Sequence, residues 1–295
     1  MQTSILQYFQ NIATPFLDHA AEYATMLGEE GVYILIIAVF YWAVSKKKGF
    51  IMASTLLISL FLNTFLKLIF HTPRPFEAIP DLQGKRLETA TGYSFPSGHT
   101  QGASSFYATL IYLFKNRILR ILCVLAILFV GISRLYLGVH WPVDVLGGWI
   151  FGIGTAWYIA SRINTLWENP EGLKRFLYIF MLFAAVITIV MIALEFISFK
   201  GSVKIDDFFK GSGMVLGCFC GFLLETSHMG FDPASGGRAK KALRVLLGLL
   251  GVLILQNGLK LILPDYFLSH FFRYGVMGFW ITYLFPMLGI RLRLF

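Results

Sequence analysis

The chain has 295 residues, of which 57% are hydrophobic and 14% charged, and its formal net charge is +9. Typical soluble domains carry about 25% charged residues, so this composition, with a mean hydropathy of +0.69, excludes an ordinary soluble protein and indicates an integral membrane protein. Because the Lys and Arg residues cluster between apolar runs, we interpret the positive charge as a determinant of membrane topology, not of nucleic-acid binding.

The first 30 residues carry an apolar stripe at three- and four-residue steps, which is typical of a helix. The stripe consists of Ile5, Phe9, Ile12, Phe16, Ala20, Tyr23 and Leu27. Asp18 and Glu22 lie on the other face, so we expect residues 1–30 to form an amphipathic helix on the outer membrane surface. A tenth span is the alternative, but both carboxylates would then be costly at depth.

The rest of the chain predicts an all-α fold, a polytopic bundle of about nine transmembrane helices. The expected spans are roughly 31–45, 49–70, 97–115, 117–138, 142–162, 174–197, 208–227, 242–263 and 270–290. The longest polar stretch, residues 72–93, connects the second and third spans, and a loop of that length is usually functional.

Basic residues distinguish the two sides of the membrane. One set of connections holds fifteen of the 25 Lys and Arg residues: Lys46, Lys47, Lys48, Lys115, Arg117, Arg120, Arg162, Lys174, Arg175, Arg238, Lys240, Lys241, Arg244, Arg291 and Arg293. The positive-inside rule places this set in the cytoplasm. We therefore expect a multi-pass protein of a plasma or inner membrane, with its N-terminus outside and its C-terminus cytoplasmic.

The first of three polar motifs runs from Lys67 to Arg74 and Pro75. Lys67 falls in the last turns of the second span, and the prolines that follow end that helix. Taken alone, Lys67 fits a side chain that snorkels to the interface.

The second motif, Phe95-Pro96-Ser97-Gly98-His99, opens the third span. Ser97 is a suitable helix cap, Gly98 lets a ligand approach the backbone, and free amides at a helix N-terminus bind anions. The alternative is an ordinary Pro-Ser helix start with a chance His99.

The third motif joins the fourth and fifth spans. Arg134 ends one span, His140 precedes the next, and Asp144 follows four residues later. If the helix extends back to His140, the imidazole and the carboxylate share a face and can hydrogen bond. An interfacial Arg–Asp pair beside a surface His is the alternative.

The predicted topology brings all three motifs to the outer membrane level, where an ionisable cluster is a functional hypothesis by default. Lys67, Arg74 and Arg134 offer positive charges for phosphate oxygens, completed by Ser97 and the amides near Gly98. Asp144 would orient His140 as a nucleophile, and His99 would protonate the leaving oxygen. Water would then hydrolyse the phosphohistidine. We expect no metal and no cofactor, because no carboxylate cluster suits Mg²⁺.

These motifs resemble the type 2 phosphatidic acid phosphatase superfamily, whose signature is K-x6-R-P, P-S-G-H and S-R-x5-H-x3-D. The chain matches all three, at Lys67–Pro75, Pro96–His99 and Ser133–Asp144. The resemblance implies a metal-independent lipid phosphatase with His140 as the nucleophile, and a catalytic transmembrane core at 31–162. Residues 163–295 would be additional transmembrane helices. Nine spans with the N-terminus outside resemble glucose-6-phosphatase in layout.

The expected substrate is a membrane lipid phosphate or diphosphate, with the bilayer as the other partner and no nucleic acid. A soluble phosphate ester such as a sugar phosphate, a phosphotransferase reaction, and a non-enzymatic lipid-phosphate binder or transporter are the alternatives. The sequence leaves the oligomeric state, the head group and the role of the additional helices open.

Three ionisable residues of those additional helices fall near the outer face of the predicted topology: Glu195, Lys260 and Arg273. They are candidates for the rim of the catalytic cavity, where a cation would attract an anionic substrate. The alternative is that they snorkel and anchor the protein at the interface.

Overall fold

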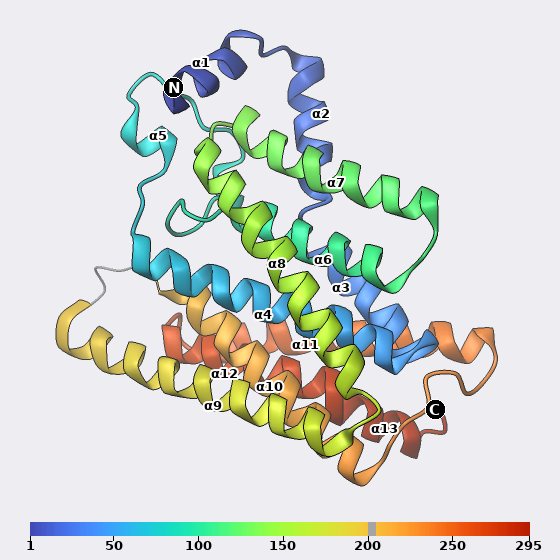
Figure 1. Ribbon diagram of the computed structural model, residues 1–295. Coiled ribbons are helices and arrows are strands. Elements are labelled where there is room, and N and C mark those ends of the chain that lie inside the picture. The colour runs from blue at the N-terminus through green and yellow to red at the C-terminus, as the bar shows by residue number, and fades with distance from the viewer. Residues whose placement is uncertain (200–204) are drawn as a thin grey trace. The chain divides into compact units, whose positions relative to one another are not determined.

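The computed structural model describes residues 1–199 and 205–295, whose regular structure is entirely helical (Figure 1). The α-helices are α1 Gln2–Asn11, α2 Pro15–Met26, α3 Glu30–Val39, α4 Lys46–Phe70, α5 Pro75–Ala78, α6 Gly98–Leu113, α7 Arg117–Tyr136, α8 Pro142–Leu166, α9 Pro170–Leu194, α10 Asp206–His228, α11 Arg238–Ile262, α12 Phe267–Phe279 and α13 Phe285–Arg291. The remaining segments are π-helical at Phe40–Val44, Glu195–Phe199 and Trp280–Leu284, and 3-10 helical at Leu87–Thr89. The predicted all-α transmembrane class is confirmed.

Within the described residues, seven helical stretches are long and apolar enough to cross a membrane. The first of them extends over Pro15–Val44 and so includes α2 as well as α3. Two predicted spans are not among the seven. Residues 97–115 form only the 16-residue α6, and residues 270–290 are interrupted by the π-helical segment Trp280–Leu284. The number nine stays a prediction.

The side chains are arranged as expected for a protein surrounded by lipid. Large apolar residues face outward, among them Trp157 on α8 and Leu261 on α11, which are 73% and 88% exposed. Polar residues face inward, most clearly on α6, which buries Thr100, Gln101, Ser104, Ser105 and Thr109. Buried polar groups need partners, so α6 is suited to a hydrogen-bonded interior and not to lipid.

Residues 1–30 form two helices where the sequence predicts one. Pro15 has no backbone N–H and cannot continue α1, and the Thr14 hydroxyl caps α2 by accepting from Leu17 N at 3.3 Å. Phe16 and Tyr23 of the predicted apolar stripe are exposed, as lipid contact requires. Asp18, in contrast, binds the protein partners Lys85 and Tyr136 and is only partly exposed. The interfacial position of this segment stays a prediction.

Contacts along the chain define two compact units. The first comprises residues 1–34 and 58–161, and the second comprises residues 35–57 and 162–295. The eight candidate site residues of the three motifs all belong to the first unit: Lys67, Arg74, Ser97, Gly98, His99, Arg134, His140 and Asp144. The three ranges expected from the sequence, 1–30, 31–162 and 163–295, stay a prediction of domain organisation.

In the first unit, α7 packs against both α6 and α2 (Figure 1). Gly131 of α7 lies under the indole of Trp149, where an added Cβ would come within 2.5 Å of the ring. The Trp149 Nε1 donates to the Ile127 carbonyl at 3.1 Å, which fixes α8 against α7. This packing holds the ends of α7 and the start of α8 in register.

In the second unit, α10 and α12 make the closest helix contact. Glycines recur on α10 at Gly213, Gly217 and Gly221, a spacing that aligns them on one face. A Cβ on Gly217 would lie 2.0 Å from the Gly275 carbonyl oxygen of α12. The two backbones touch because neither carries a side chain at this point.

Arg244, one of the basic residues assigned to the cytoplasmic connections, also has a structural role. Its side chain is fully buried in the second unit, and its guanidinium donates to the carbonyl oxygens of Leu294, Trp42, Pro233 and Ser235. It stacks on the Phe295 ring at 4.5 Å. These bonds fasten the last residues of the chain to α11.

Candidate active site

His140 lies in the turn between α7 and α8. α7 ends at Tyr136, and Gly138 then adopts φ +68°, a left-handed conformation that favours glycine. α8 begins at Pro142, as predicted from the proline. His140 and Asp144 are both buried, with 2% and 0% of their surface exposed.

His140 has one nitrogen oriented by a carboxylate and the other aimed at a cation. Its Nδ1 lies 3.3 Å from the Asp144 Oδ2, and its Nε2 lies 3.2 Å from the Arg74 Nη1. Arg74 can only donate, so Nε2 is the acceptor and Nδ1 carries the proton. Burial, followed by the charges of Arg74, Arg134 and Lys67, lowers the pKa of His140 well below its usual range. The ring is therefore neutral, and its Nε2 lone pair faces the Arg74 guanidinium.

Ser94 is a site residue that the motifs did not reveal. Its hydroxyl is fully buried and donates to the Asp144 Oδ2 at 2.5 Å, while the Trp141 backbone N–H donates to the same oxygen at 2.8 Å. The carboxylate that orients His140 is thus itself held by two further donors. A single Ser before Phe95 gives no spacing signal that could have identified it.

Arg134 is fully buried at the end of α7. Its Nη1 donates to the Thr25 hydroxyl at 2.8 Å. Its Nε and Nη2 have no hydrogen-bond partner within the described part of the chain. A buried pair of guanidinium N–H groups on one edge is the geometry that binds two oxygens of a phosphate or carboxylate.

Arg74 and Lys67 border the same space. Arg74 donates to the carbonyl oxygens of Gly92, Thr91 and Val139 at 3.1, 2.5 and 2.9 Å, so its position beside His140 is fixed. The Lys67 amine, half-buried in the last turn of α4, lies 3.5 Å from the Thr91 oxygen.

The start of α6 differs from the prediction in one detail. Ser97 occupies the cap position, but its side chain makes no capping hydrogen bond; its hydroxyl instead accepts from Thr100 Oγ1 at 2.9 Å. The Ser97 backbone N–H donates to the Asp144 carbonyl at 3.0 Å, which joins α6 to α8. A Cβ on Gly98 would point to within 3.9 Å of the Lys67 amine, so glycine leaves this space open.

His99 follows Gly98 in the first turn of α6 and is half-buried. Its Cβ faces the end of α2, 3.5 Å from the position of a Cβ on Gly28. Within the described residues its imidazole makes no hydrogen bond, so both ring nitrogens are available for a proton transfer. The eight motif residues therefore gather in the first unit, and their catalytic roles stay a prediction.

The three candidate rim residues belong to the second unit. Glu195 is buried where α9 ends, and Arg273 is buried in α12, where its Nη2 lies 3.0 Å from the His270 Nδ1. Lys260 is exposed near the end of α11. Their place at the rim of the catalytic cavity stays a prediction.

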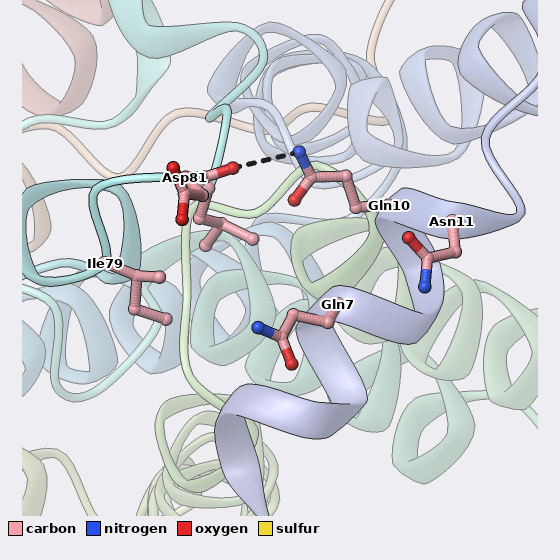
Figure 2. Close-up of a pocket in the computed structure, with 6 residues that line it drawn as sticks. Gln7, Gln10, Asn11, Ile79 and Asp81 are labelled. Atoms are coloured by element: carbon pink, nitrogen blue, oxygen red, sulfur yellow. Dashed lines mark hydrogen bonds between the residues drawn. The ribbon is translucent and has the colours of Figure 1, made fainter.

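A polar hollow of about 330 Å³ lies between α1 and the segment after α5 (Figure 2). It is lined by Gln7, Gln10, Asn11, Ile79, Asp81 and Leu82. Gln10 Nε2 donates to the Asp81 carbonyl oxygen at 3.2 Å, the bond drawn in Figure 2. The hollow contains none of the predicted site residues, but its walls attach α1 to the long polar loop.

Thr25 is the second residue that the motifs did not reveal. With Asp18, Glu22 and Glu29 it forms a polar face along α2 and the turn after it, at steps of four, three and four residues. This periodicity is visible in the sequence. The sequence predicts Asp18 and Glu22 on the polar face of this helix. In the structure Asp18 pairs with Lys85 and Glu29 pairs with Arg86, so this face is only partly exposed.

Two family models match the chain. Residues 48–168 match the PAP2 superfamily, and residues 209–295 match the PAP2 superfamily phosphatase, transmembrane extension.

Curated relatives agree with these matches. The chain is 32% identical to the undecaprenyl-diphosphatase of Sulfolobus acidocaldarius, over 49% of this chain and 68% of the relative. It is 31% identical to the lipid A 4'-phosphatase of Bacteroides thetaiotaomicron, over 56% of this chain and 79% of the relative. It is 25% identical to the probable sphingosine-1-phosphate phosphatase of Dictyostelium discoideum, over 76% of this chain and 57% of the relative.

The resemblance inferred from the three motifs is confirmed by these matches. The apolar helices and the matched transmembrane extension agree with the multi-pass membrane protein predicted from composition. The chain belongs to the PAP2 superfamily and is a membrane phosphatase of the lipid-phosphatase class, a group of metal-independent hydrolases.

Proposed function

We propose that the chain hydrolyses a membrane lipid phosphate or diphosphate through a phosphohistidine formed at His140. The observation that carries this proposal is the buried edge of Arg134, whose Nε and Nη2 lack partners among the described residues. Two unpaired N–H groups of a buried cation are costly unless a ligand binds them. A phosphate has the charge and the paired oxygens that this edge requires.

The reaction begins with attack on phosphorus. The His140 Nε2 lone pair forms the N–P bond while the bond from phosphorus to the leaving oxygen breaks. His99 gives its proton to that oxygen. The Asp144 carboxylate keeps the Nδ1 proton in place and stabilises the positive ring that results.

Water completes the cycle. It attacks phosphorus as the N–P bond breaks, His99 takes the proton of the water, and inorganic phosphate leaves with His140 neutral again. Lys67, Arg74 and Arg134 supply the positive charge that stabilises the transferring group. In this scheme the side-chain cations take the place of a metal ion.

A lipid substrate is favoured by where the site is built. The motif residues cluster where α4 and α7 end and α6 and α8 begin, and the outer surfaces of these helices are apolar. The named relatives act on an isoprenyl diphosphate, lipid A or a sphingoid phosphate. The excess of Lys and Arg in the opposite connections supports an active site on the extracytoplasmic face, with the N-terminus outside and the C-terminus cytoplasmic.

The test is phosphate release by the purified protein from phosphatidate, phosphatidylglycerophosphate, an isoprenyl diphosphate, sphingosine phosphate and glucose 6-phosphate. Turnover of a lipid with EDTA present supports the proposal. Preference for glucose 6-phosphate would favour the soluble-substrate alternative, and transfer of phosphate to an added alcohol would favour a phosphotransferase. Activity that is lost on chelation and restored by Mg²⁺ or Zn²⁺ would contradict the mechanism.

The nucleophile has its own test. His140→Ala should abolish turnover, whereas His228→Ala, a change of the same kind at an exposed histidine, should leave it intact. A substrate with a good leaving group needs no acid in the first step, so His99→Ala should accumulate an acid-labile phosphoprotein. Near-normal turnover in His140→Ala would show that another residue attacks.

A further inference from the structure

We infer that Thr25 is a positioning residue for Arg134, so that the N-terminal helix α2 completes the phosphate site. This inference rests on the proposed function, because it assumes that Arg134 binds the phosphate. The PAP2 superfamily match begins at residue 48, so Thr25 lies outside the matched catalytic module.

The contact itself is a buried, charge-assisted hydrogen bond. Thr25 and Arg134 are both fully buried, and 2.8 Å separates the Thr25 Oγ1 from the Arg134 Nη1. Among the described residues, Thr25 holds Nη1 of the guanidinium, whereas Nε and Nη2 have no hydrogen-bond partner. Holding Nη1 fixes the rotation of the planar guanidinium, and with it the direction of the free edge.

The fixed edge belongs to the catalytic space. Arg134 is close enough to His140 to be one of the cations that lower the pKa of that histidine. The same part of α2 meets α6 and α7, because a Cβ on Gly28 would lie 2.8 Å from Val130 and 3.5 Å from the Cβ of His99. The turn that follows Thr25 therefore lies against both the helix that carries Arg134 and the one that carries His99.

The position of Thr25 is secured at both ends of α2. At the start of the helix, Asp18 accepts from Tyr136 at 2.6 Å and pairs with Lys85 of the long loop. After its end, Tyr107 donates to the Leu27 carbonyl at 2.9 Å. The pair of Arg86 and Glu29, at 2.6 Å, adds a further tie to the loop. α2 crosses α7 in this region (Figure 1).

A positioned guanidinium binds phosphate without first losing rotamer freedom, so the contact acts on ligand affinity and on the transition state. Thr25→Val keeps the shape of the side chain but removes the acceptor. We expect kcat/KM to fall about tenfold, the size of one lost hydrogen bond to a charged group, and the inhibition constant for vanadate to rise by a similar factor. Thr25→Ser keeps the hydroxyl and should restore both.

The matched control is Thr109→Val. Thr109 is also fully buried in the first unit, but its hydroxyl donates to the Ser105 carbonyl of its own helix at 2.7 Å. This variant should keep wild-type kinetics and wild-type vanadate inhibition. A double-mutant cycle adds a second readout, because Thr25→Val should change vanadate inhibition little once Arg134→Ala has removed its partner.

Thr25→Ala serves as a second variant where Thr25→Val does not fold, with the same expected loss. Wild-type vanadate inhibition in a folded Thr25→Val or Thr25→Ala, or failure of Thr25→Ser to restore it, would overturn the inference while leaving the proposed function intact. Failure of the proposed function is seen separately, as no phosphate release by the wild-type protein from any of the substrates tested. That result would overturn both.

Discussion

His140 makes the pH dependence of the reaction predictable at the residue scale. Its pKa is lowered, so the neutral form persists below the ordinary histidine value of about 6.5. The acid limb of the kcat/KM profile should therefore fall below that value. In Arg74→Gln one of the lowering charges is gone, so the limb should move to higher pH.

The profile is measured with both proteins on one substrate. Ionisation of the substrate phosphate would give an acid limb at the same pH in the wild-type protein and in Arg74→Gln. A limb that moves between the two proteins therefore reports the titration of His140. An acid limb that does not move in Arg74→Gln would contradict the role assigned to His140.

Ser94 gives a second prediction at this scale. Ser94→Ala removes the donor to the Asp144 Oδ2, the oxygen that faces His140. Loss of a hydrogen bond to a buried carboxylate costs about 1.5–3 kcal/mol, so kcat should fall roughly 10- to 100-fold. Ser104→Ala is the matched control, because that buried hydroxyl has no partner in the described chain. Equal kcat values in the two variants would leave Ser94 without a positioning role.

The sequence could single out His140, Asp144 and the cations as candidates because ionisable residues are rare in apolar surroundings. It could not identify Ser94 or Thr25, because serine and threonine are common in membrane helices and loops and serve many purposes. Their roles depend on which group lies opposite, and that group comes from an element distant in sequence: Asp144 for Ser94 and Arg134 for Thr25.

At the scale of elements, the helix starts that a proline or a cap residue marks were predicted closely. The predicted starts at 97, 117 and 142 lie within one residue of α6, α7 and α8, because Pro142 and the cap residues Ser97 and Asn116 mark them. α8 continues to Leu166, four residues beyond the predicted end, since no residue there stops a helix. The predicted last span has a π-helical interruption, for which the apolar pattern gives no signal.

The contact between α10 and α12 gives a prediction at this scale. Gly217→Ala would place a Cβ 2.0 Å from the Gly275 carbonyl oxygen, so the helices must separate. We expect a loss of about 1–3 kcal/mol or more in stability, which lowers Tm by roughly 5 °C or more in detergent. Gly258→Ala is the control, since nothing lies within 4 Å of a Cβ at that position on α11. Equal Tm values for the two variants would show that α10 and α12 do not pack through glycine.

At the scale of the whole molecule, the sequence predicts a membrane protein and its active-site segments but not its two compact units. The boundaries between the units fall inside continuous helices, in the middle of α3 and α4 at residues 34–35 and 57–58 and near the end of α8 at residues 161–162. α3 and α4 remain hydrophobic on both sides of their boundaries, so the apolar pattern gives no signal there. The units are defined by contacts between segments that are distant in sequence, and a local sequence pattern carries no information about such contacts.

Membrane orientation is the prediction that concerns the whole chain. Fifteen of the 25 basic residues belong to connections assigned to the cytoplasm, and Lys67, Arg74 and Arg134 on the other side are assigned to the proposed active site. The positive-inside rule then requires the C-terminus to be cytoplasmic and the long polar loop to be extracytoplasmic. A reporter enzyme that is active only in the cytoplasm should therefore be active when it is fused after Phe295.

Single cysteines give the matching measurement. In a chain whose three native cysteines are replaced by alanine, Gln83→Cys in the polar loop should react with a membrane-impermeant maleimide in intact cells. Arg238→Cys should react only after permeabilisation. Both positions are exposed, so burial does not explain a difference between them. In the predicted topology the motif residues lie on the same side of the membrane as Gln83. Labelling of Arg238→Cys alone in intact cells would therefore place the phosphatase site on the cytoplasmic face, where its substrate would have to be supplied from the cytoplasm.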